Sequence, residues 1–175
     1  MAVAAPATRS PHTPHALSRE TLAARWFFAL ILVQGFHELE HIVQVYQRFV
    51  LHNQKGAGIL GTWIDVEPIH FAYNGVFLFA LLVTYYLGGF LTWDQRKIRP
   101  LVWWLFSFSL MFQSYHFTEH IVKFVQYLQT GLNGTPGILG QDFNLVWLHL
   151  VFNTVAFVPA LLAFFIGKYN RQVNA

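Results

Sequence analysis

The sequence predicts an all-α integral membrane protein with four transmembrane helices, arranged as two tandem helical hairpins. Hydrophobic residues make up 55% of its 175 residues and charged residues only 11%, against roughly 25% charged residues in soluble domains. The chain also repeats itself at a spacing of 79 positions, because residues 34–88 align without a gap on residues 113–167 and share 16 of 55 residues. Most of the shared residues are polar or glycine, so the match is not the chance similarity of two apolar segments.

Four apolar stretches span 26–50, 69–90, 101–128 and 145–167. Each reaches the roughly 20 residues that cross a bilayer as a helix. Each half of the repeat holds two spans, so both halves have the same orientation, and we expect a pseudo-two-fold axis along the membrane normal. The expected organisation is a flexible tail (1–22), a first hairpin (23–90), a basic linker (91–100), a second hairpin (101–169) and a C-terminal tail (170–175).

Basic residues cluster at one end of the predicted bundle and set its orientation. Eight of the eleven Lys and Arg residues lie before the first span, between the second and third spans, or after the fourth span. The positive-inside rule therefore places both termini in the cytoplasm and the protein in the plasma (inner) membrane. The net charge of +3 is explained by this distribution and gives no reason to expect a nucleic-acid partner. The chain has no cysteine, which excludes thiolate zinc sites and iron–sulfur clusters.

A stripe of polar residues runs along the first and third spans. In the first span Gln34, His37, Glu40 and His41 fall within one face at 100° per residue. Lipid cannot solvate such groups, so the stripes are expected to converge inside the bundle. The stripe recurs in the third span as Gln113, His116, Glu119 and His120, and the second and fourth spans contribute His70 with Asn74 and His149 with Asn153.

The repeated histidines have the spacing of metal ligands. Two histidines four residues apart on a helix can bind one ion, and a histidine of the neighbouring helix supplies a third nitrogen. Four-helix bundles build metal centres from such inward side chains, and a dinuclear centre on the bundle axis is the simplest arrangement, with two separate sites as the alternative. The predicted ligands are His37, His41, His70, His116, His120 and His149, with Glu40 and Glu119 as further ligands, bridges or general bases, and Gln34, Asn74, Gln113 and Asn153 as residues that orient the histidines.

Two resemblances of ligand layout accompany this prediction. The string His37-x-x-Glu40-His41 resembles the inverzincin metalloprotease pattern, which implies two zinc-binding histidines and a glutamate base. Three histidines from each of two helix pairs are similar to the layout of coupled binuclear copper proteins. Neither resemblance extends beyond the ligand layout.

Imidazole and carboxylate ligands suit iron, copper and zinc. We expect an oxygen-dependent oxidoreductase that acts on a lipid-like substrate, with up to two transition-metal ions per chain and Glu40 and Glu119 as catalytic groups. The alternatives are a haem b electron-transfer subunit, a zinc hydrolase, a metal- or proton-handling subunit of a larger membrane complex, and a purely structural hydrogen-bond network. The expected partners are the lipid bilayer, a lipophilic small molecule and other membrane subunits.

A Gly-Ile-Leu-Gly sequence follows the first and third spans, at 58–61 and 137–140. Its glycines permit tight turns. The loops either fold back over the mouth of the bundle or rest on the lipid headgroups as hairpin turns. Asp65 and Asn144 precede the second span of each half and are expected to cap those helices.

Overall fold

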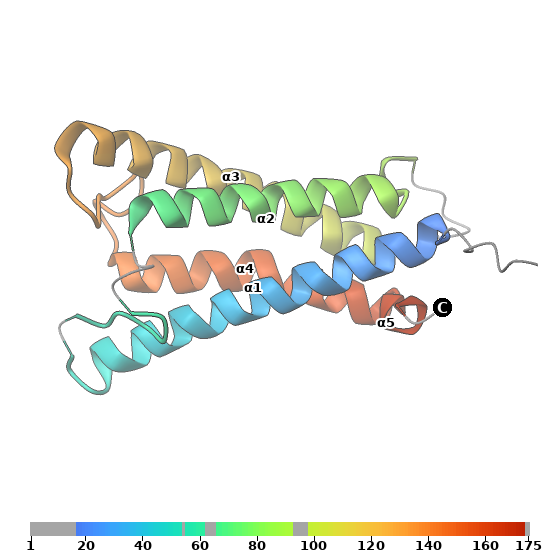
Figure 1. Ribbon diagram of the computed structural model, residues 1–175, viewed down its shortest axis with the longest axis horizontal. Helices are drawn as coiled ribbons and strands as arrows, with labels where there is room; N and C mark the ends of the chain where they lie inside the picture. Colours follow the sequence, from blue (N-terminus) through green and yellow to red (C-terminus); the bar gives the residue numbers. More distant parts are fainter. Residues whose placement is uncertain (1–16, 54, 62–65, 93–97, 174–175) are drawn as a thin grey trace, which may run out of the picture.

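The structure, a computed structural model, describes residues 17–53, 55–61, 66–92 and 98–173. It confirms the all-helical fold. Four long helices, α1 (Arg19–Phe49), α2 (Glu67–Leu87), α3 (Pro100–Thr130) and α4 (Leu145–Ile166), run alternately up and down (Figure 1). A single 3-10 turn, η1 (Phe90–Thr92), follows α2, and a short helix, α5 (Tyr169–Gln172), follows α4.

The helix ends follow from local sequence. The hydroxyl of Ser18 accepts a hydrogen bond of 3.1 Å from the Thr21 amide and caps α1. Asn144 caps α4, as predicted, by accepting from Val146 N at 3.0 Å. Its counterpart Asp65 lies outside the described residues. Gly131 ends α3 in the left-handed conformation, which favours glycine.

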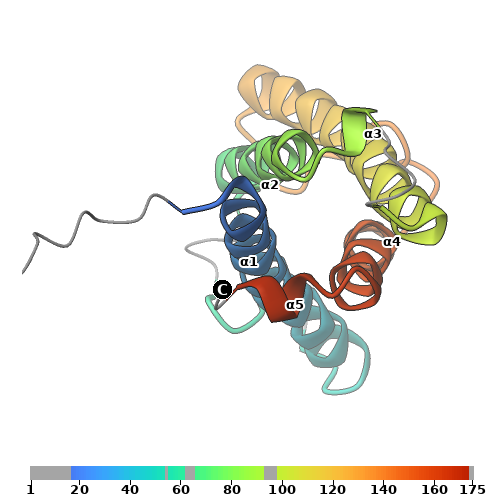
Figure 2. The same cartoon turned by 90° about the vertical axis from the view of Figure 1, so that its right-hand side faces the viewer.

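Figure 2 views the bundle from the end at which α1 begins and α5 lies, which we call the terminal end. Each helix packs on two neighbours, in the order α1, α2, α3, α4 and back to α1. The start of α1, the end of α2 and α5 lie at the same end, and the α1–α2 and α3–α4 connections lie at the other (Figure 1). We call the latter the loop end. Helix α1 begins at Arg19, within the stretch 1–22 expected to be a tail, of which residues 1–16 lie outside the described part.

Three helices, α1, α2 and α4, are long and apolar enough to cross a membrane. Four spans were expected, and α3 is the exception. It has 31 residues, like α1, but its apolar stretch is interrupted by polar residues, of which Ser109, Gln113 and His116 are buried in the bundle interior. At about 1.5 Å per residue, α1 measures about 46 Å and exceeds the roughly 30 Å of a bilayer's hydrocarbon core.

The bundle interior divides into an apolar half and a polar half. The apolar half lies toward the terminal end, where Phe27 packs edge-to-face on Phe106 and Phe164 at centroid distances of 4.9 and 5.2 Å. The polar half lies toward the loop end and holds buried Gln, His, Glu and Lys side chains. The apolar half stabilises the bundle by hydrophobic packing, which leaves the polar half free for a site.

Candidate functional site

Six histidines gather in the polar half of the bundle. His41, His116 and His120 are fully buried. Four rings form a closed circuit through all four helices, with centroid distances of 6.0 Å (His41–His70), 6.1 Å (His70–His120), 5.5 Å (His120–His149) and 5.6 Å (His149–His41). The remaining two, His37 and His116, lie one helical turn from His41 and His120. The predicted convergence of the four polar stripes is therefore observed for the histidines.

Each one-turn histidine pair brings its Nε2 atoms together. The separation is 3.1 Å between His37 and His41, and also 3.1 Å between His116 and His120. Two nitrogens bound to one transition-metal ion at about 2.0–2.1 Å lie about 3 Å apart. A hydrogen bond between neutral imidazoles has the same length, so each pair fits either a shared ion or a shared proton.

Side-chain amides lie against the Nδ1 atoms of two histidines. Nδ1 of His41 is 2.8 Å from Gln44 Oε1, and Nδ1 of His116 is 3.3 Å from Gln113 Oε1. An oxygen acceptor at Nδ1 keeps the proton there and leaves Nε2 with a free lone pair. The Nδ1 atom of His120 is buried and has no hydrogen-bond partner among the described residues. The tautomers favoured by Gln44 and Gln113 suit metal binding through Nε2.

The rings do not by themselves form a finished coordination sphere. Within the described ranges, no group of three or more His, Asp or Glu side chains is arranged closely enough to hold a metal ion. The third predicted ligand of the first set, His70, has its ring centroid 6.1 Å from that of His37 and 6.0 Å from that of His41. Closing the set requires the rings to move toward one another.

Glu40 holds the loop that follows its own helix. The amides of Ile59 and Leu60 donate to Glu40 Oε2 and Oε1 at 2.9 and 3.1 Å. Gly58 has φ +76°, and a Cβ there would collide with the Glu40 carboxylate. Gln47 completes the clamp, because its side-chain amide bonds both the N–H and the C=O of Gly58 at 2.9 and 3.0 Å. The loop therefore folds back onto α1.

Glu119 makes the corresponding contacts 79 positions later. Its Oε1 accepts from the amides of Ile138 and Leu139 at 2.8 and 3.1 Å, and Gln126 bonds Gly137 at 2.8 and 3.2 Å. The two carboxylates differ in one respect: both oxygens of Glu40 are occupied, whereas Oε2 of Glu119 is buried without a partner among the described residues. Their role as ligands or bases remains a prediction, and the observed role is to fix the loops.

The four amide residues expected to orient the histidines join the two hairpins. Gln34 Nε2 donates to Asn153 Oδ1 at 2.9 Å, and Gln113 Nε2 donates to Asn74 Oδ1 at 3.0 Å. The Asn74 and Asn153 side chains also donate to the backbone carbonyls of the histidines one turn earlier, at 2.9 Å each. Gln113 also lies within hydrogen-bond distance of an imidazole ring, that of His116.

Sequence reasoning missed a buried ion pair at the loop end. Lys123 Nζ lies 2.9 Å from Glu67 Oε1, and both side chains are almost fully buried. Lys123 also donates to the Thr135 carbonyl at 3.0 Å. The pair borders a polar cavity of about 270 Å³, which Arg48, His70 and His149 also line. The positions 79 apart from Lys123 and Glu67 are Gln44 and Val146, so the repeat gave no signal of this pair.

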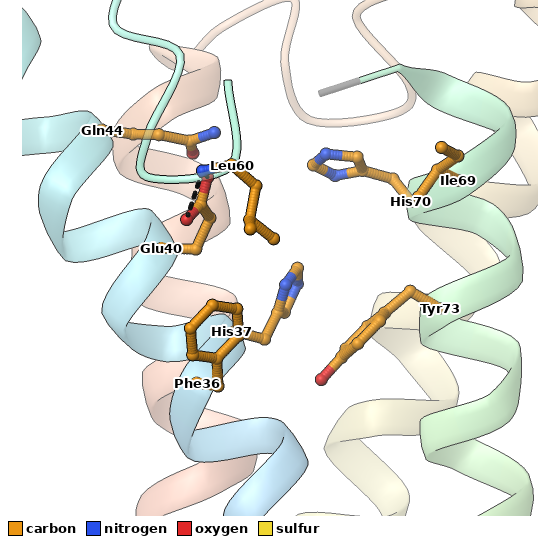
Figure 3. A pocket seen from close by; sticks show the side chains of 8 residues that line it. All are labelled: Phe36, His37, Glu40, Gln44, Leu60, Ile69, His70 and Tyr73. Carbon is orange, nitrogen blue, oxygen red and sulfur yellow. Dashed lines mark hydrogen bonds between the residues drawn. The ribbon is translucent and has the colours of Figure 1, made fainter. Parts of the chain in front are cut away.

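A second pocket opens between α1 and α2 and is almost entirely apolar. We call it the histidine pocket. Figure 3 shows His37 of α1 and His70 and Tyr73 of α2 pointing into it, and Leu60 reaching in from the clamped loop. The cluster is thus reached from two directions, through a polar cavity at the loop end and through an apolar pocket on the side.

No protein-family model, curated protein or solved structure matches this chain.

Proposed function

We propose that this protein is a membrane metalloprotein whose six-histidine cluster holds a transition-metal centre, and that the centre oxidises a lipid-like substrate with oxygen. The observation that carries the proposal is the pair of 3.1 Å Nε2–Nε2 separations. They occur in two histidine pairs from different hairpins, with His70 and His149 between them. Six imidazoles inside the bundle, three of them fully buried, have little purpose in a bilayer without an ion, because polar groups are costly there.

The spacing of the rings favours metal ions over haem. Centroid distances of 5.5–6.1 Å link histidines of all four helices. A porphyrin inserted between two of them would displace the other rings. Iron and copper suit an imidazole-rich site and support oxygen chemistry, whereas zinc would support hydrolysis.

We further propose that the two hairpins are a tandem repeat related by a pseudo-two-fold axis along the membrane normal, which also requires α3 to span the bilayer. The support is the recurrence of contacts at a spacing of 79: the loop clamps of Glu40 and Glu119, and the bonds Gln34–Asn153 and Gln113–Asn74. A dinuclear centre on that axis would take its ligands equally from both hairpins. The basic residues place both termini in the cytoplasm, and the cluster then lies toward the outer face.

Oxygen uptake tests the reaction. Protein in phosphatidylcholine vesicles, supplied with a long-chain alcohol or fatty acid, is expected to consume oxygen. His116→Ala is expected to lose that activity because it removes one Nε2 of a pair. His52→Ala is the matched control, because His52 is exposed and lies outside the cluster. Protein replete in zinc, without oxygen uptake, would overturn oxidation and favour hydrolysis.

A further inference from the structure

A groove on the outside of the bundle continues the histidine pocket toward the terminal end. It runs between α1 and α2 and its lining is apolar, with Trp26, Ala29, Val33, Tyr73, Val76 and Phe77 among its residues. Trp26, Val33 and Val76 are exposed, with 42–66% of their surface accessible. In a membrane such side chains face lipid, so the groove opens to acyl chains and not to water.

Tyr73 joins the groove to the histidine pocket, because it lines both. Its ring stacks on His37 at a centroid distance of 4.1 Å, and its hydroxyl donates to the Val33 carbonyl at 2.8 Å. The Tyr73 side chain therefore crosses from α2 to α1 where the groove meets the histidine pocket, and its ring must move aside for a chain to pass from one to the other. From Ala80 to His70 the path follows ten residues of α2, or about 15 Å.

The corresponding space between α3 and α4 is filled by aromatic rings. The positions 79 after Ala29, Val33 and Tyr73 are Phe108, Phe112 and Phe152. Phe112 packs edge-to-face on Phe152 at 5.5 Å, and Phe152 packs on His116 at 5.1 Å. The two hairpins thus carry histidines at equivalent positions but differ in side-chain size beside them. Ala29 and Val33 of α1 are small and leave a groove open, whereas α3 has phenylalanines at the equivalent positions.

We propose that the α1–α2 groove admits a single-chain amphiphile, such as a fatty acid, alcohol or aldehyde, from the bilayer. Its tail lies along Val33 and Val76, and its polar end reaches His37 and His70. This inference rests on the proposed function, because it names the substrate class and the route to that centre. The groove has a volume of about 150 Å³, which suits one acyl chain better than two.

Photolabelling tests the proposal. Palmitate with a diazirine in its tail is added to the full-length protein in phosphatidylcholine vesicles, and the labelled peptides are identified by mass spectrometry. Label is expected on α1 and α2 at the groove and should be competed by unlabelled palmitate. Label spread evenly over all lipid-facing helices, or label that does not compete, would overturn the proposal.

Two variants fill the groove with aromatic side chains, and the first of them copies Phe108 and Phe112 of α3. Ala29→Phe/Val33→Phe is expected to lose the α1–α2 label, and so is Val76→Phe, which changes an exposed side chain and leaves the fold intact. Phe108→Ala/Phe112→Val is the matched control and should keep that label. Retained label in both groove variants would contradict the proposal. Metal content is measured on the same samples. Groove labelling of metal-free protein would support the lipid site and contradict the metal centre. Bound metal with label spread evenly over the helices would support the metal centre and contradict the lipid site.

Discussion

Gln34 on α1 donates a hydrogen bond of 2.9 Å to Asn153 on α4. Both side chains are fully buried. The bond joins the first hairpin to the second about one helical turn from the histidines, on the side away from the loop end. Gln113 and Asn74 tie α3 to α2 in the same way at 3.0 Å. Polar bonds between helices in a bilayer hold positions that lipid-like side chains alone would not fix. These two bonds therefore set the distance between the hairpins on which the histidine circuit depends.

Gln34→Leu should destabilise the bundle by about 1–3 kcal/mol, because Asn153 Oδ1 would be left buried without a donor. Thermal unfolding in detergent measures the change. Adding Asn153→Leu removes the orphaned acceptor, so the double variant should recover most of the loss. A double variant with the summed loss of the two single variants would show that the hydrogen bond does not couple the helices.

Gly58→Ala should release the first loop from α1. The new Cβ would overlap the Glu40 carboxylate at a backbone φ of +76°. Gly61→Ala is the matched control, since Gly61 has φ +74° and no atom within 4 Å of an added Cβ. Both variants carry the strain of positive φ, and only Gly58→Ala adds overpacking, typically about 1–3 kcal/mol. Limited proteolysis within 55–61 should be faster for Gly58→Ala, and equal rates would contradict the clamp.

Glu40→Gln and Glu119→Gln should differ in their effect on the loops. Glu40 uses both oxygens to accept the loop amides, whereas Glu119 uses Oε1 alone. A glutamine keeps one acceptor oxygen, so hydrogen exchange should accelerate at Ile59 or Leu60 but not at Ile138 and Leu139. Metal lost from Glu119→Gln while its loop stays protected would assign the unpartnered Oε2 as a ligand.

Lys123→Met should destabilise the protein by about 3–5 kcal/mol, because it leaves the Glu67 carboxylate buried without its cation. Adding Glu67→Gln removes the unpaired charge and should recover most of the stability. Chemical unfolding in mixed micelles compares the two. A double variant as unstable as Lys123→Met alone would indicate that Lys123 acts through its bond to Thr135 and not through the ion pair.

The sequence predicted the features that depend on periodicity. Helices α2, α3 and α4 begin and end within three residues of the expected apolar stretches, whereas α1 begins seven residues before the first of them. The histidines converge because one face of each helix carries them. Periodicity did not predict the loop clamps, because the carboxylate of Glu40 can either accept hydrogen bonds from backbone amides or bind a metal ion, and the sequence does not distinguish the two roles. Pairing between unrelated positions, as in Glu67 and Lys123, leaves no periodic signal. The α1–α2 groove depends on side-chain size at Ala29 and Val33, which hydropathy does not distinguish.

The metal content of the purified protein tests the central claim most directly. Protein prepared without chelators is analysed by mass spectrometry, together with the double variant His41→Ala/His120→Ala and the control His52→Ala. The account predicts about two transition-metal ions per chain in the wild type and in His52→Ala, and none in the double variant. Wild-type protein without bound metal would contradict it and would leave the 3.1 Å histidine pairs as hydrogen bonds of a structural network.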